Sequence, residues 1–374
     1  MRPFLDLGAV VAEGPGGFLW AALLRAHGFA GSVTVLPYLN PRRWYDVAIT
    51  ALYRRFADPR DRVFLGSTPS AALYSALGVA ASVGEPFGID DSRFGVRPGA
   101  ERVRAELGLP PGRILLFAGR AQPDKDLYRL LATGLRARLL FSDLQVVIAA
   151  HVVDGAYLDT ARRRLDGEGG VRFVVTPTPD QLADLYNVAD VFVTASTSHF
   201  ETFGRAPAEA LACGTPAVAP RYDGFAEVLA QPGGTLVDVE VDGAGLPAVD
   251  EQLLLRAIYD VLSSPRRPPR AEISAHAIAR FGRSTSIANL EYLADGAPSE
   301  PPCGAAPAYL PLPTAWEPSL AELSSREPSN ALAWFWQDCD HGALAGSDGE
   351  FSAEVRRSLC VSQEAITTEP IPCR

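Results

Sequence analysis

The sequence predicts an α/β protein of two domains, each built around a parallel sheet. The chain has 374 residues, which suits two to three domains of ordinary size. Short apolar runs alternate with helical stretches over the first 90 residues and again from Ile114 onward, as in βαβ units. Between the two series lies Glu85-Pro86-Phe87-Gly88-Ile89-Asp90, whose composition is typical of an inter-domain linker.

Composition excludes several classes of protein. Apolar residues make up 47% of the chain and charged residues 21%, which excludes a disordered chain or a small disulfide scaffold. The net charge of −10 argues against a nucleic-acid partner, because nucleic-acid-binding surfaces are basic. Asp6 interrupts the first apolar stretch, so we expect no signal peptide, and no run is long enough to predict a transmembrane segment. The odd count of five cysteines then indicates reduced thiols and a cytoplasmic protein.

The elements expected in the first domain are four strands and three helices. The predicted strands are Phe4–Ala12, Ser32–Leu36, Arg62–Leu65 and Val79–Val83, and the predicted helices are Phe18–His27, Arg43–Phe56 and Ser70–Leu77.

The second series is longer and more regular, and it predicts a Rossmann-like domain. The predicted strands are Ile114–Ala118, Gln145–Ala150, Val171–Val175, Val191–Ala195 and Ala217–Ala219. The predicted helices are Asp126–Leu140, Tyr157–Leu165, Pro179–Val188, Ala206–Ala212, Glu251–Leu262 and Ser274–Leu293.

The last segment differs in composition from the rest. Residues 296–374 hold ten of the 31 prolines, eleven acidic residues against four arginines, and three of the five tryptophans. We predict an extension that wraps onto the body through its aromatic side chains, the alternative being a disordered tail. Its cysteines, Cys303, Cys339, Cys360 and Cys373, match no close-paired zinc pattern, even with His341, so no metal is expected. The domain prediction is therefore 1–90, 91–270, a closing helix at 271–295, and the extension at 296–374.

The first candidate site motif follows the strand Ile114–Ala118. Gly119 allows a turn, and Arg120 and Lys125 follow on a loop that opens a helix. Two cations at a helix N-terminus suit a diphosphate, although surface charge on a solvated loop is the simpler explanation of the pair alone. Lys125 is also the only lysine among 34 basic residues. Codon bias explains the excess of arginine over lysine. Under such a bias, a lysine remains at a position where arginine cannot replace it.

The second motif is Glu201-Thr202-Phe203-Gly204-Arg205-Ala206-Pro207-Ala208-Glu209. Pro207 suits the first turn of a helix. The free amides near Gly204 and Arg205 would then face the cleft expected between the two domains. Glu201 and Glu209 could accept hydrogen bonds from sugar and ribose hydroxyls. A third stretch, Ala212-Cys213-Gly214-Thr215-Pro216, ends this helix, and Cys213 is expected to be a buried small side chain.

Together these motifs resemble the donor-nucleotide domain of retaining glycosyltransferases with the GT-B fold, in particular glycosyltransferase family 4. The resemblance spans Ile114 to Val237 and includes the linker at Pro86-Phe87-Gly88-Ile89-Asp90. It implies two Rossmann-like domains facing a cleft, and a nucleotide-diphosphate sugar as the donor. It further implies catalysis without a metal or other cofactor, with a donor phosphate oxygen rather than a protein base taking the acceptor's proton.

The same resemblance implies a role for each matching residue. Arg120 and Lys125 would bind the diphosphate and Glu201 the transferred sugar, so these three are the expected catalytic residues, with Gly119 beside them. Glu209 would bind the ribose. Amides of Phe203, Gly204 and Arg205 would contact sugar or phosphate, and the base would lie near Thr176 and Pro177. Arg205 departs from the family's usual apolar residue and could contact a further phosphate or an acceptor carboxylate. His199 and His151 could border the donor, although structural roles are simpler for both.

The first domain matches the family less well, because about four strands precede the linker where the family has six or seven. Either the first three strands are absent, or Gly16 and Gly17 belong to the glycine-rich loop that approaches the donor phosphates. A shortened sheet would expose an edge, which the extension, a protein partner or a second copy could cover. The function expected is a retaining glycosyltransferase with an unidentified acceptor. The alternatives are a catalytically degenerate binding or scaffolding subunit and, less well supported, another nucleotide-binding Rossmann enzyme.

Overall fold

The structure is a computed structural model that describes residues 7–14, 16–41, 44–84, 88–106, 108–152, 155–165, 169–241 and 247–295. The extension at 296–374 and its cysteines lie outside the described residues, as do the first three residues of the predicted linker. The wrapped extension and its disordered alternative therefore stay predictions.

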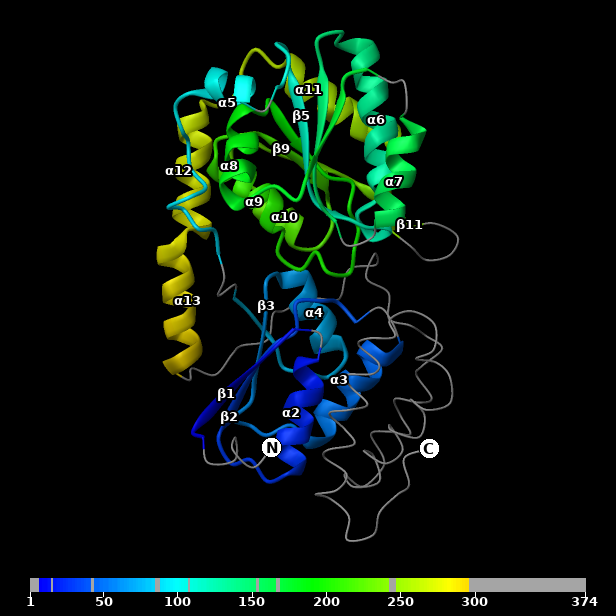
Figure 1. Cartoon of the computed structure of the whole chain (residues 1–374). Coiled ribbons are helices and arrows are strands. Elements are labelled where there is room, and N and C mark those ends of the chain that lie inside the picture. Colours follow the sequence, from blue (N-terminus) through cyan, green and yellow to red (C-terminus); the bar gives the residue numbers. More distant parts are fainter. Residues whose placement is uncertain are drawn as a thin grey trace.

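The first domain is drawn in blue in the lower part of Figure 1 and holds a four-stranded parallel sheet in the order β1-β2-β3-β4. The Phe18 ring lies 5.0 Å from that of Tyr53 and 5.3 Å from that of Tyr74, so three helices meet over one core. β1 is an outer strand, and its Val11 is 62% exposed. The elements are β1 (Ala9–Glu13), α2 (Gly17–Ala26), β2 (Ser32–Leu36), α3 (Trp44–Phe56), β3 (Arg62–Leu65), α4 (Thr68–Ala76) and β4 (Ser82–Val83).

The second domain holds a six-stranded parallel sheet in the order β10-β9-β8-β5-β6-β7. The chain winds outward from β5 in one direction and from β8 in the other, so the strand order reverses between these two strands. A small antiparallel pair, β11 with β12, completes the domain. Its strands are β5 (Ile114–Ala121), β6 (Gln145–Val152), β7 (Val171–Val175), β8 (Val191–Val193), β9 (Ala217–Pro220), β10 (Gly234–Val237), β11 (Val239–Val241) and β12 (Pro247–Val249).

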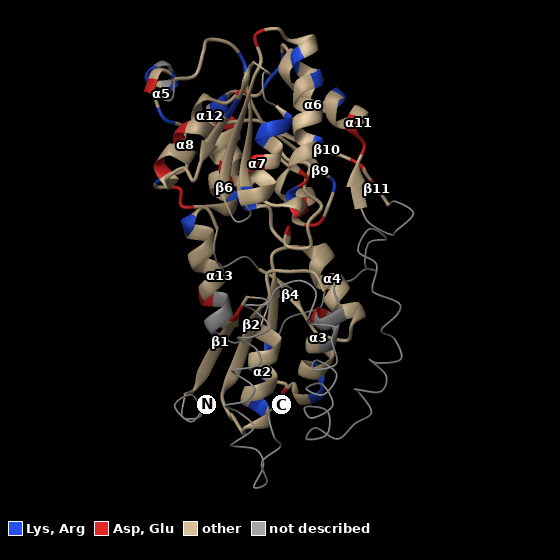
Figure 2. Ribbon diagram, turned by 45° about the vertical axis from the view of Figure 1, so that its right-hand side comes forward, with Lys and Arg blue, Asp and Glu red and all other residues tan. Residues whose placement is uncertain are grey.

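Helices cover both faces of this sheet, as its nearly continuous apolar strands require. Charged residues lie on the outer surfaces of α6 and α11 (Figure 2). The helices are α5 (Ala100–Glu106), the 3-10 turn η1 (Pro123–Lys125), α6 (Leu127–Leu140), α7 (Gly155–Arg164), α8 (Pro179–Val188), α9 (Arg205–Ala212), α10 (Gly224–Val228), α11 (Glu251–Ser263), α12 (Arg270–Phe281) and α13 (Arg283–Asp295).

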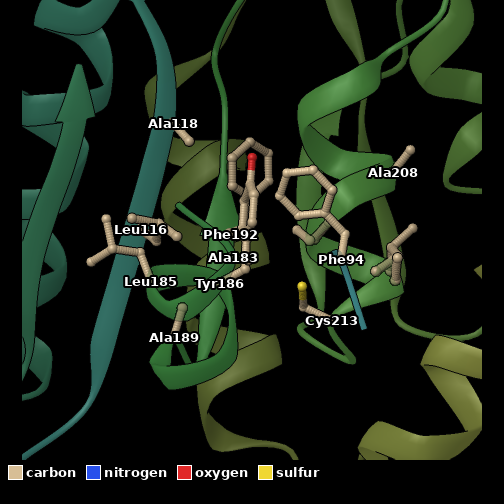
Figure 3. Packing of buried hydrophobic residues seen from close by; sticks show 14 of the residues in the cluster. Phe94, Leu116, Ala118, Ala183, Leu185, Tyr186, Ala189, Phe192, Ala208 and Cys213 are labelled. Carbon is tan, nitrogen blue, oxygen red and sulfur yellow. The ribbon is translucent and has the colours of Figure 1, made fainter. Parts of the chain in front are cut away.

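One layer of the core lies between the sheet and the helices α8 and α9 (Figure 3). The rings of Phe94 and Phe192 lie 6.1 Å and 5.9 Å from the ring of Tyr186, which is fully buried. Cys213 lies in the same layer with 0% exposure, and this burial raises the pKa of its thiol to about 12. Cys213 is therefore the buried small side chain that the sequence predicts.

Several predicted boundaries differ from the structure, among them the start of β4, which is Ser82 rather than Val79. The single helix expected over Ser274–Leu293 is two helices, α12 and α13, which break at Gly282. A Cβ at Gly282 would lie 2.5 Å from the carbonyl oxygen of Ile278, so only glycine fits this close turn. β5 continues three residues beyond the expected end at Ala118, and α5, α10 and the strands after β9 were not predicted.

The two domains meet where α4 of the first faces α10 of the second. α13 extends from the second domain down beside the first in both views (Figures 1 and 2). Among the described residues, no helix is long and apolar enough to cross a bilayer.

Candidate functional site

A cavity of about 750 Å³ opens at the carboxyl ends of the central strands of the second domain. This is the position where ligands bind in open parallel sheets, because the helices on either side diverge where the strand order reverses. Its walls include eight residues that the sequence singles out: Gly119, Arg120, Lys125, His151, Pro177, Glu201, Arg205 and Glu209.

Arg120 lies on a strand rather than on the loop that the sequence predicts. β5 pairs with β6 as far as Ala121 opposite Val152, so the ladder holds Arg120 in an extended backbone. Its guanidinium lies over the Phe200 ring, 5.3 Å from the ring centre, and 3.1 Å from Asp124 Oδ2. These contacts fix a cation at the cavity wall before any ligand arrives.

Lys125 is the last residue of η1, two residues before α6 begins. Asp126 follows it with a φ of 46° and accepts a hydrogen bond from the Arg129 amide, which caps α6. The predicted placement of both cations at the start of one helix is thus wrong in detail. Arg120 reaches the cavity from the end of a strand, and Lys125 reaches it from the turn that follows.

Lys125 Nζ donates a hydrogen bond to Glu201 Oε1. The two side chains are only 12% and 14% exposed, so their ion pair is weakly screened by solvent. Glu201 lies in a turn closed by its own amide on the Ser198 carbonyl, 3.0 Å away. The first and second motifs, 76 residues apart, therefore meet in one place.

Glu209 and Arg205 lie one turn apart on α9, which begins after Gly204. Gly204 has a φ of 101°, and a Cβ there would lie 2.8 Å from the Phe225 ring, so both conformation and space call for glycine. Tyr186 Oη donates to Glu209 Oε2 at 3.2 Å. Burial raises the pKa of Glu209 to about 7, although Arg205 and the Tyr186 hydrogen bond both oppose this shift.

The rest of the cavity wall includes apolar side chains, and the sequence predicts it only in part. Pro177 lines it as predicted, and Phe94, Leu182 and Arg93 line it too. Phe94 and Arg93 come from the polar stretch after the predicted linker, which has no helical or strand period that could reveal a binding role. Arg93 lies 3.3 Å from Asp180 at the start of α8.

Several predicted residues lie near the cavity without lining it. Thr176 precedes Pro177 with a φ of 48°, and Gly204 shapes the start of α9. Phe203 turns away and packs edge-on against Phe281 of α12, with ring centres 5.6 Å apart. The His199 ring lies against that of Phe200, 4.0 Å away.

Gly16 and Gly17 lie at the start of α2, in the first domain, and are not among the residues of the cavity wall. A Cβ at Gly17 would lie 2.7 Å from the Ala12 carbonyl oxygen, so close packing of helix on strand accounts for glycine at this position. Their predicted contact with donor phosphates stays a prediction.

Within the part of the chain that the structure describes, no group of three or more His, Cys, Asp or Glu side chains is placed to hold a metal ion. The prediction of a metal-independent site stays a prediction.

The second domain is similar in sequence to known glycosyltransferases. Residues 100–278 match the family model described as glycosyl transferases group 1. A D-inositol 3-phosphate glycosyltransferase of Catenulispora acidiphila is 36% identical over 250 residues, which cover 62% of this chain and 55% of that protein. One from Saccharomonospora viridis is 38% identical over 210 residues, 52% of this chain and 44% of that protein. The chain thus spans about half the length of the curated relatives that it matches.

Solved structures extend the similarity to both domains. The structure of Anabaena Alr3699/HepE in complex with UDP-glucose has a TM-score of 0.65 at 18% identity, covering 79% of this chain and 80% of that one. Sucrose-phosphate synthase from Thermosynechococcus elongatus has a TM-score of 0.62 at 21% identity, covering 77% and 73%. At these identities the likeness establishes the fold, two Rossmann-like domains. The chain therefore has the GT-B fold, and its residues 100–278 are similar to glycosyl transferases group 1.

Proposed function

We propose that this chain transfers a sugar from a nucleotide-diphosphate sugar to an acceptor hydroxyl, with retention of configuration at the anomeric carbon of the transferred sugar. The observation that carries the proposal is the convergence of Arg120, Lys125, Glu201 and Glu209 on one cavity. Two fixed cations suit a diphosphate, and two carboxylates suit hydroxyl groups on either side of it. The first donor to test is UDP-glucose, because the Anabaena structure was solved in complex with it.

Under this proposal, residues of the cavity wall are assigned to each part of such a donor. The apolar side chains of Phe94 and Leu182 would hold the base, and Glu209 would accept hydrogen bonds from the ribose hydroxyls. Arg120 and Lys125 would flank the diphosphate, and Glu201 would orient the sugar. Lys125 would then contact both the leaving group and the carboxylate that holds the sugar.

The chemistry follows from where charge develops. When the bond between the sugar carbon and the phosphate oxygen breaks, negative charge grows on the leaving diphosphate, and prepositioned cations stabilise it. The acceptor hydroxyl would attack from the leaving-group face and give its proton to a donor phosphate oxygen. This route needs no protein base. The names of the curated relatives make inositol phosphate the first acceptor to test.

Donor affinity should rise with pH, because a ribose hydroxyl donates to the ionised form of Glu209. With its pKa raised to about 7, that carboxyl is mostly protonated at pH 6 and mostly ionised at pH 8. We expect about a tenfold gain in affinity between these values if the protonated form does not bind. Titration calorimetry with an intact nucleotide sugar measures it, since its esterified phosphates do not titrate in this range.

The matched control is Glu209→Gln, which keeps the shape of the side chain and removes the titration. Its affinity should be lower and independent of pH. A pH dependence that survives in Glu209→Gln would assign the titration to another group, and would contradict this role of Glu209.

Thermal unfolding with UDP, GDP and ADP sugars tests the proposed donor. A ligand at one hundred times its Kd stabilises the folded state by about 2.7 kcal/mol, which shifts the Tm by several degrees. Stabilisation by one nucleotide series, followed by donor consumption with an acceptor and NMR of the product anomer, supports a retaining transferase. Donor binding without turnover over a panel of acceptors favours the binding or scaffolding subunit, and no stabilisation by any of the sugars contradicts the transferase.

A further inference from the structure

A buried polar cluster joins the two domains. It consists of Asn40 after β2, Ser67 and Ser70 at the start of α4, and Asp223 before α10. Each of the four is at most 2% exposed. Asn40 Nδ2 and Ser67 Oγ each donate to the Asp223 carboxylate. Ser70 Oγ lies 2.9 Å from both carboxylate oxygens and from Asn40 Oδ1.

Burial of the Asp223 carboxylate in this position costs free energy of folding. Burial disfavours the charged form and raises the pKa of Asp223 to about 6. Its backbone is also strained, with a φ of 44° and a ψ of −131°. Three donors from the first domain offset part of this cost. The cluster therefore stabilises Asp223 only while the domains are in contact.

The cluster is connected to the donor cavity through α10. Gly224 follows Asp223, and a Cβ there would lie 2.3 Å from the Phe203 carbonyl oxygen, so the backbones touch. The next residue, Phe225, lines the cavity and contacts the start of α9 at Gly204. α10 thus packs against the carboxyl end of the loop that carries Glu201.

The other end of that loop is held by the first domain directly. The Asn40 amide donates to the His199 carbonyl at 2.7 Å. Asn40 therefore has two contacts with the second domain: its backbone holds the loop at residue 199, and its side chain holds Asp223. A further contact across the junction joins the Thr68 amide to Glu227 Oε1 at 2.8 Å.

We infer that Asn40 and Asp223 are positioning residues that hold the first domain against the loop at 199–204, and so keep Glu201 in place beside Lys125. The inference about the reaction rests on the proposed function. The inference about the loop does not, because it concerns contacts that exist without a donor.

Hydrogen exchange of the loop's backbone amides in the full chain tests whether Asn40 and Asp223 hold the loop in place. Asn40→Ala and Asp223→Ala should each raise exchange over 199–204 by tenfold or more. Asp223→Asn should stay near the wild type, because its amide can still pair with Asn40 and the two serines. The control is Asp238→Ala, which removes an exposed carboxylate paired with Arg221. Unchanged exchange in folded Asn40→Ala and Asp223→Ala would overturn the inference, whatever the wild type does with a donor.

Kinetics then separate positioning from general loss of structure. If the wild type consumes a donor, Asn40→Ala should lower kcat by tenfold or more and leave the affinity for the nucleoside diphosphate within about threefold of the wild type. Asp223→Ala should have the same effect as Asn40→Ala, and Asp223→Asn should not. An equal loss in Asp223→Asn, or a loss confined to nucleotide affinity, would contradict the positioning role. A wild type that consumes no donor refutes the proposed function, and hydrogen exchange still decides the question of the loop.

Discussion

Replacing Lys125 by alanine is expected to lower kcat/KM for the donor by about 10²–10³-fold, the usual cost of losing one prepositioned group that stabilises developing charge. Lys125 contacts Glu201 in a nearly solvent-free part of the cavity, where its charge is weakly screened. Its removal takes away a cation at the leaving group and leaves Glu201 without its partner. Initial rates of donor consumption measure the loss.

Two comparisons make the Lys125 result specific. Arg256→Ala removes an exposed cation that pairs with Asp260 on α11, away from the donor cavity, and should leave the rate unchanged. Lys125→Arg keeps the charge but adds bulk in a side chain that is only 12% exposed, so it should restore little activity. Wild-type activity in Lys125→Ala would remove this residue from the proposed mechanism.

The largest effect on stability is expected at Arg270, the first residue of α12. Its guanidinium donates to three carbonyl oxygens at the end of α8, those of Tyr186, Asn187 and Ala189, at 2.8 to 3.2 Å. It also donates to the Cys213 carbonyl oxygen at 3.1 Å, which ends α9. One cation therefore satisfies the carboxyl ends of two helices that pack on the donor cavity.

Arg270→Ala should lower the free energy of unfolding by about 3–5 kcal/mol, because several buried carbonyl groups lose their donor at once. Urea unfolding measures the change. Arg280→Ala, on the exposed side of the same helix, removes only a contact with the Phe281 ring and should cost less than about 1 kcal/mol. Equal losses in the two variants would show that the carbonyl contacts of Arg270 add little.

Local sequence patterns predicted most of the elements and eight of the residues that line the cavity. Strands Ser32–Leu36 and Val171–Val175 and the helix Pro179–Val188 match the prediction at both ends. Each is bounded by a strong local signal, such as the Thr178 capping box ahead of the last of these. The convergence of Lys125 and Glu201 followed from a general rule, since the carboxyl ends of parallel strands meet at one edge of a sheet.

What could not be predicted depends on contacts between distant residues. Arg120 is extended because β6 continues beside it, which the composition of Gly119 and Arg120 does not reveal. The cluster around Asp223 joins residues separated by up to 183 positions, and none of its members stands out in its own stretch of sequence. The position of Arg93 and Phe94 in the cavity wall was missed because it depends on contacts with α8, which comes much later in the chain.

Every residue that lines the donor cavity falls between Arg93 and Phe225, in the second domain. If the proposed donor binds there, the residues that choose its nucleotide and sugar lie in one stretch of the chain, separate from the first domain. Recombination near the linker could exchange one half and leave the other intact, so new pairings of donor and acceptor can arise without redesign of either. The contacts that must remain compatible in such a chimera include those between Asn40 and the carboxylate it meets.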